Sequence, residues 1–279
     1  MNFKRYNRYF SINFLLYIMG RFKTIRKLYK IFKINKKQTL IIDATNEEYI
    51  NSDLNENLII NEIEKNGFYN NIQLDHTTLN YIKNLCSRSE MVSALDGKKF
   101  NSISQVDNFN NTNEKPCCLL DIVNPELDQI LKKISRDKRL LNIANNYLGK
   151  VNNIDTKIQF SPVCDATDKW REISKQTVTF HYDVHNLNFL YVFFYLTDCD
   201  KESGAHELIK KSHNKKFFFK HLIGSVKQNR ISLENDYNIN DFIIIEGHAG
   251  HGFIEDTSCY HRALKPIKKP RLAMQFRYY

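Results

Sequence analysis

The stretch Thr177-Val-Thr-Phe-His-Tyr-Asp183 carries the residues on which the interpretation of this chain depends. Its β-branched and aromatic residues favour an extended strand, in which alternate side chains point to one side. His181 and Asp183 would then project together, roughly 6.5–7 Å apart along the backbone. His261 follows 78 positions after Asp183 and could add a second imidazole. Two imidazoles and one carboxylate suit a ferrous ion that keeps coordination positions open.

The surroundings of His261 are compatible with this grouping. Residues 242–246 and 271–279 both have the composition of strands, so His261 would lie between two strands of a sheet. The simpler alternative is that His181 and Asp183 form a hydrogen-bonded pair within a sheet and that His261 is an ordinary loop histidine. The residue types alone leave both interpretations open.

Longer segments around these residues resemble a known enzyme family. The segments are Phe180 to Asp198, which runs into an apolar strand, Lys201-Glu-Ser-Gly-Ala-His-Glu-Leu-Ile-Lys-Lys-Ser-His213, Gly247-His-Ala-Gly-His-Gly-Phe-Ile-Glu-Asp-Thr-Ser-Cys-Tyr-His-Arg262, and Pro270-Arg-Leu272. In this order they resemble the phytanoyl-CoA dioxygenase family of iron(II)/2-oxoglutarate oxygenases, especially its bacterial members. The resemblance covers roughly residues 55–279.

The resemblance implies that His181, Asp183 and His261 are the catalytic iron ligands and that Arg271 binds the distal carboxylate of 2-oxoglutarate. It further implies Fe(II) as the cofactor, 2-oxoglutarate and O2 as co-substrates, and hydroxylation of a small metabolite, lipid or glycan-related substrate. Related halogenases have a small residue at the position of Asp183, so a carboxylate there favours hydroxylation or another oxidation.

Arg271 also suits this role on physical grounds, because a guanidinium can hold a carboxylate with two parallel hydrogen bonds and a lysine cannot. If Arg271 begins the last strand, alternation separates a polar face from an apolar face. The polar face would carry Arg271, Ala273, Gln275 and Arg277, and the apolar face Leu272, Met274 and Phe276. The alternative for Arg271 is a surface ion pair.

Some positions depart from the family pattern. Lys211-Ser-His213 stands where family members usually have Gly-Ser-His, and His248 and His251 occupy positions that are usually small residues or proline. His185 would lie on the same strand face as His181. Each of these three extra histidines could contact the substrate or replace a proposed metal ligand.

The pattern of elements predicts an α+β fold. Helices are expected at residues 55–66, 75–87, 125–134 and 139–148, each with a suitable capping residue or proline, and strands follow from Asp155 to the end. We therefore expect a double-stranded β-helix, a jelly-roll or cupin-like barrel, braced by N-terminal helices. The predicted dioxygenase domain spans residues 41–279, with a helical part at 41–150 and barrel strands at 151–279.

The N-terminal segment carries the charge imbalance. Residues 1–42 contain eleven Lys and Arg and no acidic residue, whereas the rest of the chain has 30 basic and 31 acidic residues, so the net charge of +10 resides here. The apolar run at 10–20 is shorter than the roughly 20 residues that span a bilayer, and no cleavage site of a signal peptide follows it. Residues 1–40 are expected to form a basic amphipathic segment that either contacts an anionic membrane or packs on the domain.

The remaining composition bounds the function. Six cysteines without a Cys-x-x-Cys pair suggest neither a zinc site nor a disulfide framework, which favours a reducing, cytoplasmic location. If the basic segment contacts a membrane, the expected position is peripheral, at the inner face. No nucleic-acid-binding motif accompanies the basic segment, so no nucleic acid partner is expected. The alternative to an oxygenase is a metal-binding barrel without redox chemistry, either a cupin-like isomerase or hydrolase or a component of a pathway assembly.

Overall fold

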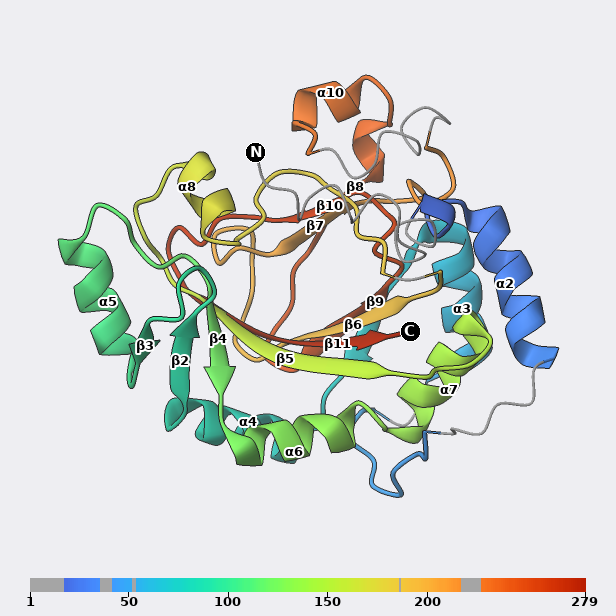
Figure 1. Ribbon diagram of the computed structural model, residues 1–279, viewed down its shortest axis with the longest axis horizontal. Coiled ribbons are helices and arrows are strands. Elements are labelled where there is room, and N and C mark those ends of the chain that lie inside the picture. The colour runs from blue at the N-terminus through green and yellow to red at the C-terminus, as the bar shows by residue number, and fades with distance from the viewer. Residues whose placement is uncertain (1–17, 36–41, 52–53, 186, 217–226) are drawn as a thin grey trace, which may run out of the picture.

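The computed structural model describes residues 18–35, 42–51, 54–185, 187–216 and 227–279. Figure 1 shows a large sheet across the middle of the molecule, with helices on one side and a small sheet on the other. The chain is thus a mixture of helices and antiparallel sheets, as predicted. The first part of the predicted amphipathic segment, residues 1–17, lies outside the described residues.

The large sheet contains eight antiparallel strands in the order β1-β9-β6-β11-β5-β4-β2-β3. The strands are β1 (Phe68–Gln73), β2 (Glu90–Ser93), β3 (Lys99–Phe100), β4 (Leu120–Val123), β5 (Ile154–Ser161), β6 (Leu190–Tyr195), β9 (His251–Glu255) and β11 (Arg271–Tyr278). Strands β5 and β11 pair along their whole length, with Arg271 opposite Ser161. The predicted last strand is confirmed.

The small sheet has the order β10-β7-β8, with β7 at His206–Ile209, β8 at Phe242–Ile245 and β10 at His261–Ala263. Its inner face packs on the large sheet, because Leu208 and Ile245 form one apolar cluster with Tyr195 and Phe253. This cluster holds the two sheets together beside the predicted site.

Helices α3 (Glu56–Asn66), α4 (His76–Ser87), α6 (Pro125–Ile134) and α7 (Lys138–Leu148) cover the other face of the large sheet, with α2 (Lys23–Asn35) beside α3 and α5 (Ile103–Thr112) beside β3. Helices α8 (Asp168–Ile173) and α10 (Arg230–Glu234) lie on the side of the small sheet, and the short 3-10 turn η2 (Ile239–Asp241) precedes β8. The predicted caps are present: Asn55 and Asp75 accept hydrogen bonds from the first turns of α3 and α4. Gly67 ends α3 with a φ of 90°, a conformation that glycine adopts without strain.

Alternation along the central strands separates the core from the site. On β6, Leu190, Val192 and Phe194 enter the main apolar core beneath the sheet, whereas the intervening aromatic residues face the small sheet. On β11, Met274 and Phe276 are fully buried, and Arg271, Ala273, Gln275 and Arg277 line a cavity on the opposite face. The alternation predicted for this strand is therefore confirmed.

The prediction of a helical part at residues 41–150 is incomplete. The four helices expected there are present, but β1 to β4 also belong to this part and extend both edges of the large sheet. These strands are short, with two to six residues, and β1 contains Asn70 and Asn71 with an irregular register against β9. Segments of this length offer few positions at which the alternation typical of strands can be recognised.

The prediction of a regular strand at Thr177–Asp183 is wrong. The backbone is extended, but only isolated bridges form, from Phe180 to Gln228 and from His181 to His261. The amide groups of Val178 and Thr179 instead donate to the Glu172 carboxylate, at 2.8 Å each. The Glu172 carboxylate thus accepts hydrogen bonds from two backbone N–H groups that would pair with a neighbouring strand in a sheet.

Helix α2 packs on the domain through a buried cation. Arg26 is 4% exposed and forms a two-pronged ion pair with Asp256, at 3.0 and 2.8 Å. Asp256 lies in the turn between β9 and β10, so α2 supports the segment that leads to His261. The opposite face of α2 is apolar and exposed, with Leu28, Ile31 and Phe32 at 53%, 56% and 73%.

Candidate metal centre

The backbone places His181 and His261 directly opposite each other. The amide of His181 donates to the carbonyl of His261 at 3.0 Å, and the amide of His261 donates to the carbonyl of His181 at 2.8 Å. Residues that exchange both hydrogen bonds are cross-strand neighbours with side chains on the same side. The two rings accordingly lie 4.4 Å apart between centroids.

Each imidazole is oriented by a backbone carbonyl. Nδ1 of His181 lies 3.1 Å from the carbonyl of Thr179, and Nδ1 of His261 lies 3.0 Å from the carbonyl of Cys259. Because a carbonyl only accepts, each Nδ1 carries a proton, which leaves Nε2 as the nitrogen that faces the group. Metal-binding histidines are commonly held in this way.

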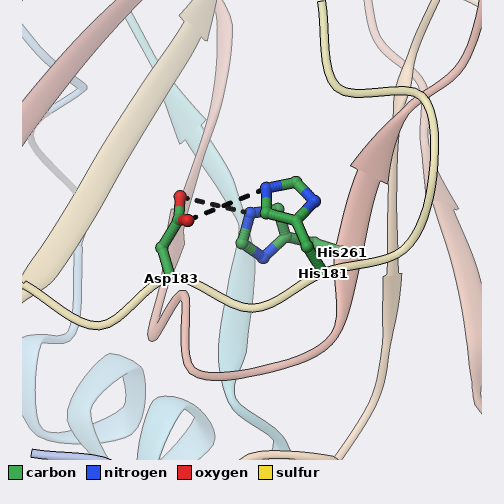
Figure 2. Close-up of side chains that lie close together, drawn as sticks. All are labelled: His181, Asp183 and His261. Carbon is green, nitrogen blue, oxygen red and sulfur yellow. Dashed lines mark ion pairs between the residues drawn. The ribbon is translucent and has the colours of Figure 1, made fainter. Parts of the chain in front are cut away.

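Asp183 points between the two rings, as Figure 2 shows. Its carboxylate oxygens lie 3.8 Å from Nε2 of His181 and 3.7 Å from Nε2 of His261. Two ligand atoms about 2.1 Å from one ion can lie up to about 4.2 Å apart, so both separations fit a shared ion. Among the described residues, these three form the group of His, Cys, Asp and Glu side chains that could hold a metal.

The charges of the group also suit a cation. Burial and the adjacent His261 lower the pKa of His181 to about 4. Burial opposes a charge on His261 as well, but Glu255 and Asp183 outweigh it and raise the pKa of His261 to about 9. Burial would raise the pKa of Asp183, yet its hydrogen bond to His261 and the nearby histidines hold it well below its usual range. A carboxylate and an imidazolium thus share the space that a metal would occupy.

A buried carboxylate behind His261 was not found from the sequence. Glu255 is fully buried, and its oxygens lie 3.4 Å from Nδ1 of His261 and 2.7 Å from Nε2 of His206. The His206 and His261 rings stack at 5.3 Å between centroids. The sequence offers one indication of this residue. Glu255 ends the apolar run Gly252-Phe-Ile-Glu255, and a carboxylate in a buried strand needs a charged or hydrogen-bonding partner.

The three extra histidines lie elsewhere. His185 contacts the ring of Tyr279, with centroids 4.4 Å apart. His248 is 98% exposed in its side chain, and Nε2 of His251 lies 2.7 Å from the side-chain oxygen of Asn70. None of them belongs to the metal-binding group among the described residues.

The group opens into a cavity of about 410 Å³ between the two sheets. Arg271 lines this cavity and donates to the carbonyl of Gly204, while its Nη2 lies 3.5 Å from Oγ of Ser161. Its Nε is buried and has no hydrogen-bond partner among the described residues. These contacts fix the guanidinium at the edge of the cavity.

Further charged residues line the same cavity. Arg262 is held by Glu207 at 2.6 Å, and Arg277 is paired with Asp155. Burial lowers the pKa of Lys157, which projects from β5 into the cavity. Apart from Asp155 and Asp183, the charged residues that line the cavity are cations, so its walls favour anionic ligands.

Comparison with solved structures places the chain in a known fold. HygX from Streptomyces hygroscopicus, solved with nickel, 2-oxoglutarate and hygromycin B bound, matches over 79% of this chain and 86% of its own length, with 12% identity and a TM-score of 0.52. EvdO2 from Micromonospora carbonacea var. aurantiaca, complexed with 2-oxoglutarate, matches over 83% and 93%, with 13% identity and a TM-score of 0.52. The epimerase SnoN, in complex with Fe3+, alpha-ketoglutarate and nogalamycin RO, matches over 80% and 82%, with 13% identity and a TM-score of 0.50.

These matches establish the fold. The chain spans about half, 49%, of the length of EvdMO1, and between 76% and 96% of the length of seven other matched structures. No protein-family model matches the chain, and no curated protein is similar to it in sequence.

Proposed function

We propose that this chain is an Fe(II)- and 2-oxoglutarate-dependent oxygenase that hydroxylates a small molecule, with His181, Asp183 and His261 as iron ligands and Arg271 as the anchor of 2-oxoglutarate. The observation that carries the proposal is the convergence of two oriented Nε2 atoms and one carboxylate at a cavity that Arg271 also lines. The matched structures add that proteins of this fold hold nickel or iron together with the same keto acid.

When bound, iron with 2-oxoglutarate and O2 supplies the oxidising power for hydroxylation. The protein residues hold and orient these groups. The carbonyls of Thr179 and Cys259 keep both Nε2 atoms directed at the ion, and Asp183 supplies a negative charge beside them. Arg271 would hold the far carboxylate of 2-oxoglutarate, and Phe193 and Phe253 line the same cavity.

The finer classification of the fold belongs to the same proposal. A large and a small antiparallel sheet that face each other around the site are what a double-stranded β-helix requires, and the helices of residues 55–148 brace its outer face. We propose membership of the phytanoyl-CoA dioxygenase family on the motifs around His181 and His261. The division into a segment at 1–40 and a domain at 41–279 is retained as a proposal, although Arg26 ties α2 to the domain.

The cavity supports a small-molecule substrate. A volume of about 410 Å³ lies within the range of about 300–1,000 Å³ typical of such sites. HygX and SnoN bind hygromycin B and nogalamycin RO, which are small molecules. The test is release of succinate from 2-oxoglutarate by iron-loaded protein offered pools of metabolites. Succinate above the level of zinc-loaded protein supports the proposal, and none from any pool would favour a metal-binding barrel without redox chemistry.

We also propose that residues 1–40 contact an anionic membrane from the cytoplasmic side. The support is the exposed apolar face of α2 at Leu28, Ile31 and Phe32, next to the exposed Lys27, in a segment without acidic residues. No helix of the described residues is long and apolar enough to span a bilayer. Sedimentation with anionic vesicles should weaken when Phe32 is changed to Glu, and equal binding would contradict the proposal.

A further inference from the structure

Two thiols outside the candidate metal centre lie in contact. Sγ of Cys164, in the segment between β5 and α8, is 3.7 Å from Sγ of Cys118, just before β4. Cys118 is fully buried, whereas Cys164 is partly exposed. The other four cysteines are buried free thiols. The pair therefore combines proximity with access for a small reagent.

The surroundings make the two thiols unequal. Arg171 is buried and donates to the backbone carbonyl of Cys164, which places its guanidinium beside this thiol. The hydrogen bond with Cys118 and the charge of Arg171 outweigh burial and lower the pKa of Cys164 to about 7. The same hydrogen bond and burial raise the pKa of Cys118 well above its usual range. Near neutral pH, Cys164 is thus the nucleophile and Cys118 retains its proton.

We infer that Cys164 and Cys118 form a redox-active dithiol that is oxidised to a disulfide by hydroperoxides, with Cys164 as the attacking and Cys118 as the resolving thiol. The Cys164 thiolate attacks one peroxide oxygen, the O–O bond breaks, and hydroxide leaves while Cys164 becomes a sulfenic acid. Sulfur of Cys118 then displaces the hydroxyl group as its proton is lost, which forms the S–S bond. Two thiols are oxidised and one hydrogen peroxide is reduced to two waters.

The required movement is small. The two sulfurs of a disulfide lie about 2.05 Å apart. The present Sγ–Sγ distance of 3.7 Å must therefore shorten by about 1.7 Å. The two segments are already joined by a hydrogen bond of 2.9 Å from Nε1 of Trp170 to the carbonyl of Pro116.

The dithiol lies behind one wall of the cavity. Leu119 follows Cys118 and lines the cavity, and Gln176, another lining residue, accepts a hydrogen bond of 2.7 Å from Arg171. A disulfide would therefore fasten two segments that supply cavity residues. This inference rests on the thiol geometry and is independent of the proposed oxygenase activity.

The test is oxidation of the reduced full-length protein by a small excess of hydrogen peroxide, followed by alkylation and peptide mapping. We expect one disulfide, between Cys118 and Cys164. Cys118→Ser should instead accumulate a sulfenic acid at Cys164 that dimedone traps, Cys164→Ser should form neither product, and Cys117→Ser should behave as the parent protein. Thermal unfolding of each variant verifies that it is folded.

A second measurement needs no variant. The rate of Cys164 alkylation by iodoacetamide should reach half of its maximum near pH 7, below the value of about 8.5 for an ordinary thiol. The inference is overturned if peroxide leaves both thiols reduced, if Cys117 replaces either of them in the disulfide, or if the alkylation midpoint lies near 8.5.

Discussion

At the scale of single residues, the site depends on what lies behind each ligand atom. Two backbone carbonyls fix the protonated Nδ1 atoms, and the antiparallel bridge between His181 and His261 fixes the separation of the rings. The candidate ligand atoms are therefore held in the absence of a metal, which would reduce the cost of ordering them around an ion. Asp183, at 48% side-chain exposure, is the least restrained of the three.

Replacing Asp183 with Ala should remove iron from the protein, because two imidazoles remain to hold the ion without a compensating charge. We expect iron content after gel filtration to fall to background, while thermal unfolding of the metal-free protein changes little. His185→Ala is the matched control and should retain iron, since His185 contacts Tyr279 instead of the cluster. Equal iron loss in both variants would contradict the assignment.

Replacing Arg271 with Lys should raise the 2-oxoglutarate requirement roughly tenfold to a hundredfold. The charge is retained, but a two-pronged contact is lost, and one charge-assisted hydrogen bond is worth about 1.5–3 kcal/mol. Titration of 2-oxoglutarate measures this change. Arg277→Lys, on the same face of β11 but paired with Asp155, is the control. An unchanged requirement in Arg271→Lys would place the carboxylate elsewhere.

At the scale of elements, α2 is coupled to the turn between β9 and β10. Asp256 in this turn is fully buried and accepts hydrogen bonds from Arg26, Tyr147 and Ser258. The Arg26 charge outweighs the effect of burial and holds the pKa of Asp256 well below its usual range. A helix that was predicted as a separate basic segment thus supports the chain that carries His261.

Arg26→Met should lower the free energy of unfolding by about 3–5 kcal/mol, because it leaves the Asp256 carboxylate buried without its cation. Lys27→Met, at the next and exposed position of the same helix, should change it by less than about 0.5 kcal/mol. Denaturant unfolding of the metal-free proteins measures both values. Similar effects of the two substitutions would show that Arg26 contributes no more than a surface lysine.

Helices and the last strand could be predicted because their signals are local. Asn55 and Asp75 cap α3 and α4, and alternation places Arg271 in the cavity. Strands β1 to β4 could not be predicted, because they are short and because β1 and β4 pair with β9 and β5, which lie far away in the sequence. The carboxylate of Glu172 likewise decides the conformation of residues 177–179 through contacts that no local pattern records.

At the scale of the whole molecule, the site is built from segments that are far apart in the sequence. The triad could be predicted from residue types and a family resemblance, and the structure brings all three side chains together. Two buried ion pairs could not be predicted, because each joins segments far apart in the sequence. They are the pair of His206 with Glu255 behind His261 and the pair of Arg26 with Asp256, which lie 230 residues apart. Charge pairing across such distances leaves no periodic signal in a sequence.

Global stability should fall in mild acid, because burial lowers the pKa of His213 to about 3. Below about pH 6.5 the unfolded chain takes up a proton at this position while the folded chain does not, so stability is lost as the pH falls from 6.5. Between pH 7.5 and 5, we expect metal-free protein to lose on the order of 2 kcal/mol from this group. Denaturant unfolding at both values should show a smaller loss in His213→Gln than in His248→Gln, and equal losses would contradict this account.

The most direct test of the oxygenase proposal is anaerobic titration of the iron-loaded protein with 2-oxoglutarate. A keto acid chelated to a ferrous ion gives a weak visible charge-transfer band, so the proposal predicts that this band appears and saturates with 2-oxoglutarate. The band should be absent in Asp183→Ala and should require more 2-oxoglutarate in Arg271→Lys. If folded protein that retains iron at the His181, Asp183 and His261 group gives no band, the central claim is contradicted.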